Sequence, residues 1–302
     1  MSADQDINSP IKILLLGSDS DVGEAFLDFA QPLAEFEIAP LSMDVVLKTS
    51  LPLPDNENYD FIVDAMSIDR IFSKNYVELI NEYSQWALKS NTTILMLSSA
   101  LVFSGSKGSS YNESDEPDNK DKHGQVLAKI EKMILKHDDN IVLRSGWLFG
   151  SKTRKENQEN DFVRKTIKSL KEGKELDYQP DFLGSPTPIS DLIRVTLSLI
   201  KQRYYGAKTG AKNAGVYHYC CAEEISWLGY AKAILMVAAQ YDLKLDSYTE
   251  IFNEDLVESS EIHVELLRQS LSCRKIFNHF GVKQRPWRPS LKNLIKGLYQ
   301  VE

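Results

Sequence analysis

The sequence predicts an α/β fold built on a doubly wound parallel sheet, with a smaller lobe formed by the C-terminal half. In the first 150 residues, short apolar runs recur along the chain, and amphipathic segments of helical spacing lie between them. Continuous apolar runs are typical of parallel strands buried on both faces, and their alternation with helices indicates right-handed βαβ units. The 302 residues, 42% of them apolar, suffice for one large domain or two of ordinary size.

Strands and helices are expected to alternate from residue 11 to residue 150. The run IKILLLG (11–17) ends in glycine, as a buried strand does before a turn, and a helix follows it until Pro32 interrupts the pattern. The same reasoning predicts strands at 36–41, 59–66 and 140–150, and a strand that runs into a serine-rich loop over 92–105. It predicts helices at 76–90 and from His123–Gly124 to about residue 136.

The pattern changes beyond residue 150. A polar loop is expected at 151–161, followed by a helix at 161–173 that Gly173 ends and a helix at 190–202 that Ser190 or its neighbour caps. A turn at 207–215, a short strand at 215–221 and a long helix at 226–241 follow, before a mixed C-terminal part. We therefore expect a sheet domain over 1–150, to which elements of the C-terminal half return, and a mixed α/β lobe over 151–302.

Composition and charge exclude several classes of protein. The net charge of −8 argues against nucleic acid or an anionic membrane as the main partner. No apolar run approaches the ~20 residues that a membrane-spanning helix needs. The first residues, MSADQDINSP, resemble neither a signal nor a transit peptide, so a cytoplasmic location is expected. The oligomeric state stays open, and a homodimer is compatible with the sequence.

The cysteines and histidines do not suggest a metal site. Cys220, Cys221 and Cys273 form no C-x-x-C arrangement, and the five histidines show no H-x-x-x-H or H-E-x-x-H spacing. Three cysteines with an adjacent pair suit reduced thiols, which we expect to be buried.

The first strand-to-helix turn is the place where such a sheet can hold a dinucleotide pyrophosphate. The turn reads GSDSDVGEAF, in which two glycines are six residues apart, as in G-x-x-G-x-x-G, but Ser20 stands in the middle. Asp19 and the acidic residue two positions on add negative charge where a dianion would bind. Binding of NAD or NADP is thus open, and purely structural glycines are the alternative. The candidate cofactor-binding residues are Gly17, Ser20, Asp21, Val22 and Gly23.

Seven stretches along the chain carry a more specific pattern. They are LSSALVFSG, YNESDEP, HGQVLAKIE, LRSGWLFG, DFLGSPTPISDLIRV, GVYHYCCAEEISWLGYAKAI and RPWRPSL. In this order, they resemble motifs of the dTDP-4-dehydrorhamnose reductase family, which belongs to the extended short-chain dehydrogenase/reductases. The resemblance spans nearly the whole chain and implies a Rossmann-like fold that binds NAD(P).

The resemblance implies hydride transfer from NAD(P)H to a keto group on a nucleotide sugar. In such a family a serine or threonine holds the carbonyl oxygen and a tyrosine supplies the proton. A lysine four residues after the tyrosine lies on the same helix face and lowers the tyrosine pKa, because its charge stabilises the phenolate.

When the family's serine or threonine, tyrosine and lysine are carried over position by position, this chain retains only part of the set. Ser99 keeps the hydroxyl, His123 stands in place of the tyrosine, and Leu127 stands in place of the lysine. The resemblance also places Asp64 and Ser98 at the cofactor cleft. In the substrate lobe it points to Thr187 and Arg288. Ordinary structural roles are the alternatives, since Ser98 could end a strand and Thr187 could begin a helix.

Two hypotheses follow. In the first, the chain keeps the fold, has lost the standard reductase chemistry, and acts by binding a nucleotide-sugar-like molecule or a partner protein. The regulatory β subunit of methionine adenosyltransferase is a precedent in this family. In the second, the chain is an active NAD(P)H-dependent reductase in which His123 gives the proton, since an unperturbed pKa near 6.5 suits a general acid. Binding of a nicotinamide cofactor distinguishes the two.

Overall fold

The fold is described from a computed structural model of the chain. The described residues are 9–48, 58–66, 75–150, 161–173, 182–207, 210, 213–246 and 267–300. The predicted loop at 151–161 lies outside them apart from its last residue, and the predicted turn at 207–215 lies partly outside them.

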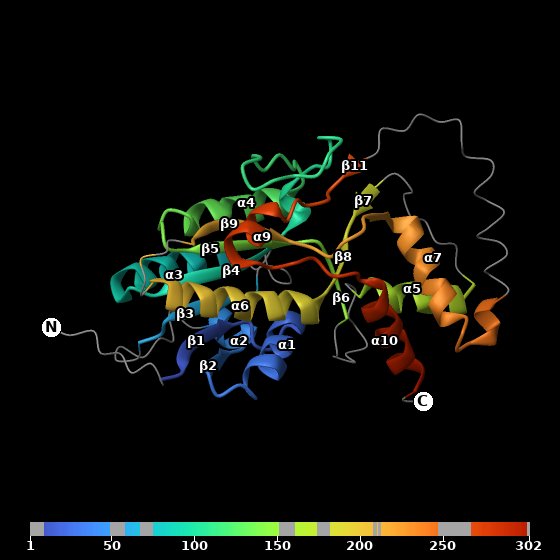
Figure 1. The fold of residues 1–302 in the computed structure, drawn as a ribbon, viewed down its shortest axis with the longest axis horizontal. Coiled ribbons are helices and arrows are strands. Elements are labelled where there is room, and N and C mark those ends of the chain that lie inside the picture. Colours follow the sequence, from blue (N-terminus) through green and yellow to red (C-terminus); the bar gives the residue numbers. More distant parts are fainter. Residues whose placement is uncertain are drawn as a thin grey trace.

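A six-stranded parallel sheet forms the centre of the molecule (Figure 1). Its order is β2-β1-β3-β4-β5-β9, so the doubly wound arrangement predicted from the sequence is confirmed. The order reverses between β1 and β3, and ligands of such sheets bind outside the carboxyl ends of the strands at that point. The strands are β1 (Ile11–Leu16), β2 (Phe36–Leu41), β3 (Phe61–Asp64), β4 (Thr93–Ser99), β5 (Ile141–Ser145) and β9 (Gly215–Tyr219).

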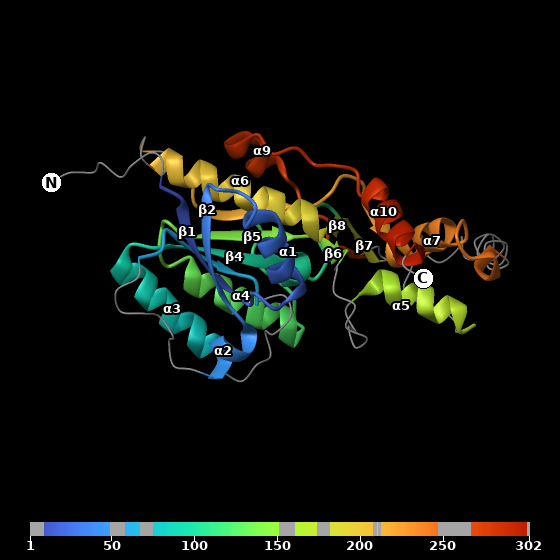
Figure 2. The same cartoon turned by 90° about the horizontal axis from the view of Figure 1, so that it is seen from below.

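Helices cover both faces of the sheet, as Figure 2 shows. α1 (Asp21–Ala30) packs beside α6 (Ile189–Ala207) on one face, and α3 (Tyr76–Ser90) packs beside α4 (Lys122–Ile134) on the other. The apolar faces of these helices and the strands form one continuous core. Shorter elements at the ends of the sheet are α2 (Met43–Lys48), the 3₁₀ helix η1 (Ala100–Val102) and α9 (Arg274–Phe280), which contacts β9.

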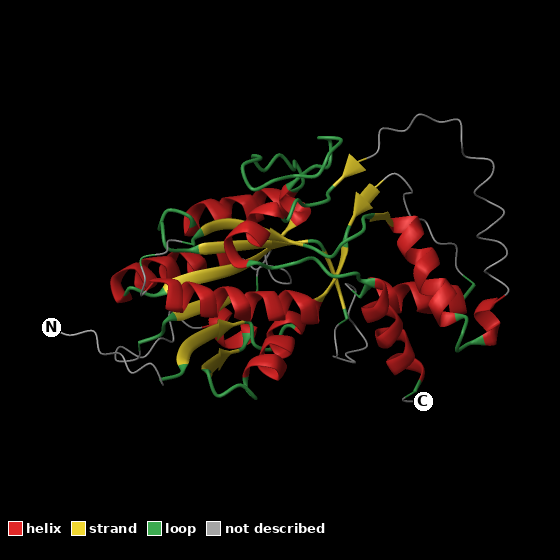
Figure 3. Ribbon diagram, viewed as in Figure 1, coloured by secondary structure: helices red, strands yellow, loops and turns green. Residues whose placement is uncertain are grey.

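A second hydrophobic core lies in the C-terminal lobe, around Val163, Ile234 and Trp287. Its helices are α5 (Phe162–Lys171), α7 (Trp227–Ala238) and α10 (Arg288–Tyr299), and η2 (Leu243–Leu245) follows α7 (Figure 3). Two small sheets complete it: β10 (Ile225–Ser226), β7 (Phe182–Gly184) and β11 (Leu267–Arg268) in one, and β6 (Trp147–Phe149) with β8 (Pro186–Pro188) in the other.

Two sequence predictions need correction. The segment 140–150 is not one strand, because the chain leaves the main sheet at Gly146 and continues as β6 in another sheet. A side chain at Gly146 would place its Cβ 2.3 Å from the Ser185 carbonyl oxygen, so the crossing requires glycine. The prediction that Ser190 or its neighbour caps the helix at 190–202 is also wrong, since α6 begins at Ile189, directly after β8.

Within the described part of the chain, we find no helix long and apolar enough to cross a membrane.

Candidate functional site

The glycine turn between β1 and α1 is held by its own hydrogen bonds. Ser20 is the N-cap of α1: its hydroxyl accepts from the Gly23 amide at 2.9 Å and donates to the Gly17 carbonyl at 2.7 Å. Gly17 has a φ of +77°, and a Cβ at Gly23 would lie 2.0 Å from the Gly17 oxygen. The backbone conformation and the close helix–strand contact therefore account for both glycines, and Ser20 is buried as a cap.

This turn fits a pyrophosphate poorly. The amides of Gly17 and Ser18 both donate to the Leu41 carbonyl, at 2.8 and 2.9 Å. The carboxylate of Asp19 accepts from the Met43 amide at 2.5 Å, and that of Asp21 stands in the first turn of α1, with Val22 buried behind it. The positive potential at a helix N-terminus attracts anions. Negative side chains there neutralise this potential, so it no longer favours an anionic ligand.

Asp64, at the carboxyl end of β3, joins that strand to the next helix. One carboxylate oxygen accepts from the Met66 amide at 2.9 Å and the other accepts from the Tyr76 hydroxyl at 2.5 Å. The side chain is fully buried. Both oxygens thus hold the connection between β3 and α3.

Ser99 stands at the end of β4, and His123 stands in the first turn of α4. The Ser99 hydroxyl accepts from the Leu101 amide at 3.2 Å and so caps η1. A Cβ at Gly124 would lie 2.5 Å from the Leu101 carbonyl oxygen, so the first turn of α4 packs directly on η1. The two candidate catalytic groups therefore lie on contacting elements.

The imidazole of His123 is half-buried, and burial lowers its pKa below the usual 6.5. The ring is therefore neutral near pH 7 and lacks the proton that a general acid must give.

Leu127 lies in the hydrophobic core. It is fully buried on the same face of α4 as Ile130 and Ile134, against the sheet. The position at which the resemblance would put a lysine is therefore an apolar packing position.

A buried polar network lies one turn further along α4. Arg144 on β5 makes a paired contact with Glu131: Nε lies 3.0 Å from Oε1, and Nη2 lies 2.7 Å from Oε2. The Ser98 hydroxyl donates to the same carboxylate at 2.5 Å. Nη1 of Arg144 is 3.4 Å from Nε2 of His218, whose pKa is lowered to about 3 by burial and then by the Arg144 charge.

The sequence alone does not identify this network. It indicates Ser98 as a cofactor-binding candidate, and in the structure the Ser98 hydroxyl donates to Glu131. The available indication was the position of Glu131, four residues after Leu127 and three before Ile134, on an otherwise apolar helix face. A carboxylate at such a position needs a buried cation.

The two lobe candidates differ in exposure. Thr187 is buried in β8, and its hydroxyl donates to the Ser185 carbonyl at 3.1 Å and accepts from the Cys221 amide at 3.3 Å. Arg288 is exposed at the start of α10, where it lies 3.0 Å from a Glu223 carboxylate oxygen. The Thr187 hydroxyl thus bonds to backbone groups of the protein, while the exposed Arg288 side chain is able to reach a ligand.

Three aromatic rings stack in the lobe. The indoles of Trp147 and Trp227 stack with centroids 3.7 Å apart and planes 9° apart, and both residues are partly exposed. Phe182 stacks on Trp147 at 6.3 Å. A Cβ at Gly184 would lie 2.2 Å from the Trp147 ring, so glycine is required beneath it.

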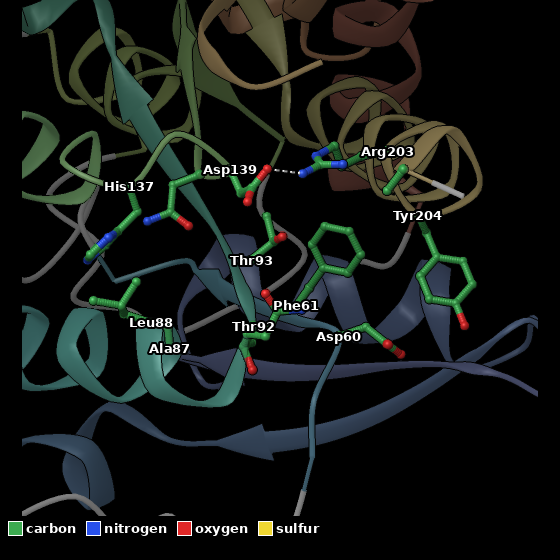
Figure 4. Close-up of a pocket in the computed structure, with 13 residues that line it drawn as sticks. Asp60, Phe61, Ala87, Leu88, Thr92, Thr93, His137, Asp139, Arg203 and Tyr204 are labelled. Atoms are coloured by element: carbon green, nitrogen blue, oxygen red, sulfur yellow. Dashed lines mark hydrogen bonds and ion pairs between the residues drawn. The ribbon is translucent and has the colours of Figure 1, made fainter. Parts of the chain in front are cut away.

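One cavity of about 340 Å³ lies at the opposite, amino ends of the strands (Figure 4). Arg203 donates from Nη2 to Asp139 at 2.5 Å across it, near His137 and Phe61. None of the residues predicted as functional lines this cavity. The described residues also contain no cluster of His, Cys, Asp and Glu side chains able to hold a metal ion.

Comparison with protein families gives one match, described as "RmlD substrate binding domain", over residues 73–300. Among curated proteins, the chain is similar to a dTDP-4-dehydrorhamnose reductase of Aggregatibacter actinomycetemcomitans, with 23% identity over 301 residues, 94% of this chain and 98% of that protein. It is also similar to one of Sinorhizobium fredii, with 25% identity over 206 residues, 68% of this chain and 66% of that protein.

Solved structures agree at the level of fold. A dTDP-4-dehydrorhamnose reductase from Clostridium acetobutylicum superposes with a TM-score of 0.70 at 19% identity, covering 95% of this chain and 99% of that one. One from Bacillus anthracis, in complex with NADP, gives 0.69 at 18% identity and the same coverage.

Proposed function

Since the chain belongs to the RmlD substrate-binding-domain family of dTDP-4-dehydrorhamnose-reductase-like proteins, we propose that it binds a nucleotide-sugar-like ligand without the standard reductase chemistry. The observation that carries this proposal is Leu127, which is fully buried in the core at the position of the expected lysine. A lysine there would stabilise a phenolate and contact the cofactor ribose, and leucine does neither.

Two further features support the loss of this chemistry. His123 is half-buried with a lowered pKa, so it is a poor proton donor near neutrality. The glycine turn is closed by the Ser20 cap and carries Asp19 and Asp21, so it suits neither NAD nor NADP well. Both changes weaken catalysis, and neither removes the lobe that would recognise a nucleotide sugar.

In this proposal, residues 1–150 supply five of the six strands of the main sheet, and residues 151–302 supply β9 and most of the ligand contacts. The stacked and partly exposed Trp147–Trp227 pair offers an apolar aromatic surface that a base or sugar can contact. Arg288 offers a guanidinium for a diphosphate, because its present pair with Glu223 is about half exposed and so is worth little.

Substitution of Arg288 tests the lobe. We expect Arg288→Ala to weaken binding of dTDP-glucose on the order of tenfold to a hundredfold, since a hydrogen bond to a charged group contributes about 1.5–3 kcal/mol. The measurement is a calorimetric titration of the full chain. Lys292→Ala is the matched control, because Lys292 is exposed on the same helix. Equal affinities for all three proteins would remove Arg288 from the site.

The second candidate function is an active reductase with His123 as the proton donor. The packing of α4 on η1, which places His123 beside the element that follows Ser99, favours it. Because the proton would come from imidazolium, turnover of a keto-sugar nucleotide with NADPH should rise as pH falls below 6.5. His123→Ala should abolish it, and turnover that is independent of this substitution would exclude the role.

A further inference from the structure

Two thiols that no role accounts for lie against each other. The sulfurs of Cys220 and Cys273 are 3.7 Å apart, although the residues are separated by 53 positions. The Cys220 amide also donates to the Cys273 sulfur, at 3.3 Å. Both side chains are buried, Cys220 directly after β9 and Cys273 directly before α9.

The spacing suits a disulfide. An S–S bond is about 2.05 Å long, so the sulfurs would have to approach by about 1.7 Å, which small side-chain rotations can supply. A cavity of about 580 Å³ is lined by Cys220 and Cys273, so a small oxidant can reach the buried pair. Adjacent Cys221 instead points its sulfur toward Asp191, at 3.9 Å.

The two thiols differ in character. A hydrogen bond from Cys273 lowers the pKa of Cys220, and the same pairing together with burial raises the pKa of Cys273. The amide of Gln284 adds a second donor to the Cys220 sulfur, at 3.5 Å. Cys220 is therefore the nucleophile of the pair, since thiolate rather than thiol reacts.

We propose that Cys220 and Cys273 form an oxidisable pair that reacts with a hydroperoxide to give an intramolecular disulfide. The Cys220 thiolate attacks the peroxide, an S–O bond forms as the O–O bond breaks, and the departing oxygen leaves after protonation, as water from hydrogen peroxide or as an alcohol from an organic hydroperoxide. The Cys273 sulfur then attacks the Cys220 sulfenic acid: the S–S bond forms, the S–O bond breaks, and the second oxygen leaves as water with the Cys273 proton. The two thiols lose two electrons in total, which reduce one hydroperoxide.

The disulfide would lie at the crossing from the sheet to the C-terminal lobe. Just beyond Cys220, the Cys221 amide donates to Thr187 and Ala222 pairs with Pro286. Joining Cys220 to the start of α9 would tie this crossing to the edge of the sheet. Both cysteines belong to the core of the main sheet, so the bond would join the end of β9 to the start of α9 beside this crossing.

Thiol counting after oxidation tests the proposal. The full-length protein is treated with a small excess of hydrogen peroxide, denatured, alkylated and examined by mass spectrometry. We expect wild type to lose two of its three alkylatable thiols and to yield one linked peptide pair containing Cys220 and Cys273, with recovery by dithiothreitol. Cys221→Ser is the matched control and should form the same link.

In Cys220→Ser, the Cys273 thiol should form no intramolecular disulfide. In Cys273→Ser, the same should hold for the Cys220 thiol. If one of these variants fails to fold, the peptide map of Cys221→Ser decides the matter, because Cys220 is then the one cysteine of its peptide. Survival of all three thiols, a link to Cys221, or a link between chains would overturn the proposal.

Discussion

Replacing Glu131 by alanine is expected to lower the free energy of unfolding by about 3–5 kcal/mol, because it leaves the buried guanidinium of Arg144 without its counter-charge. The Ser98 hydroxyl would lose its acceptor at the same time. Equilibrium denaturation in urea measures the change. The size of the effect follows from burial, since both side chains of the ion pair are less than 5% exposed.

An exposed ion pair supplies the control. Lys12 and Glu37 lie 3.8 Å apart on neighbouring strands with both side chains more than half exposed. Glu37→Ala should change stability by less than about 0.5 kcal/mol. Equal effects of the two substitutions would mean that the buried Glu131–Arg144 ion pair stabilises the packing of α4 on β5 no more than an exposed pair does.

Replacing Leu127 by lysine is expected to destabilise the protein by about 3 kcal/mol or more and to restore no reductase activity. The substitution removes a fully buried apolar side chain and leaves an ammonium group in the core. In an active reductase of this family the lysine would face the cofactor, so the same change would be tolerated. Thermal or urea unfolding, with an NADPH oxidation assay beside it, measures both outcomes.

Leu127→Met is the matched variant, because it keeps the volume and the apolar character and should cost less than about 1.5 kcal/mol. A Leu127→Lys protein as stable as wild type, with measurable turnover, would mean that the position opens onto the cleft. That result would favour the active-reductase function.

The sheet was predictable because its determinants are local. β1, β3, β4 and β5 are continuous apolar runs buried on both faces, and the helices between them carry apolar residues at helical spacing. The break at Gly146 was not predictable, because apolar residues resume at Trp147 after only three positions and the glycine is required only by the approach of the Ser185 carbonyl.

The candidate site was less predictable, because its side chains meet across long separations. Asp19 caps a helix on another βα unit, and Glu131 meets Arg144 from a neighbouring strand. Ser20 could be located in the turn from the sequence, but its use as an N-cap depends on hydrogen-bond geometry. The contact between Cys220 and Cys273 could not be read from the sequence, because the two residues are 53 positions apart.

Calorimetric titration of the full chain with NADPH and NADH, beside dTDP-glucose, distinguishes a ligand-binding protein from a working reductase. A capped turn with two carboxylates and a buried leucine in place of lysine should leave both cofactors unbound at millimolar concentration, while dTDP-glucose binds. Cofactor binding at micromolar concentration or below, with turnover of a keto-sugar nucleotide, would instead identify the chain as a working reductase.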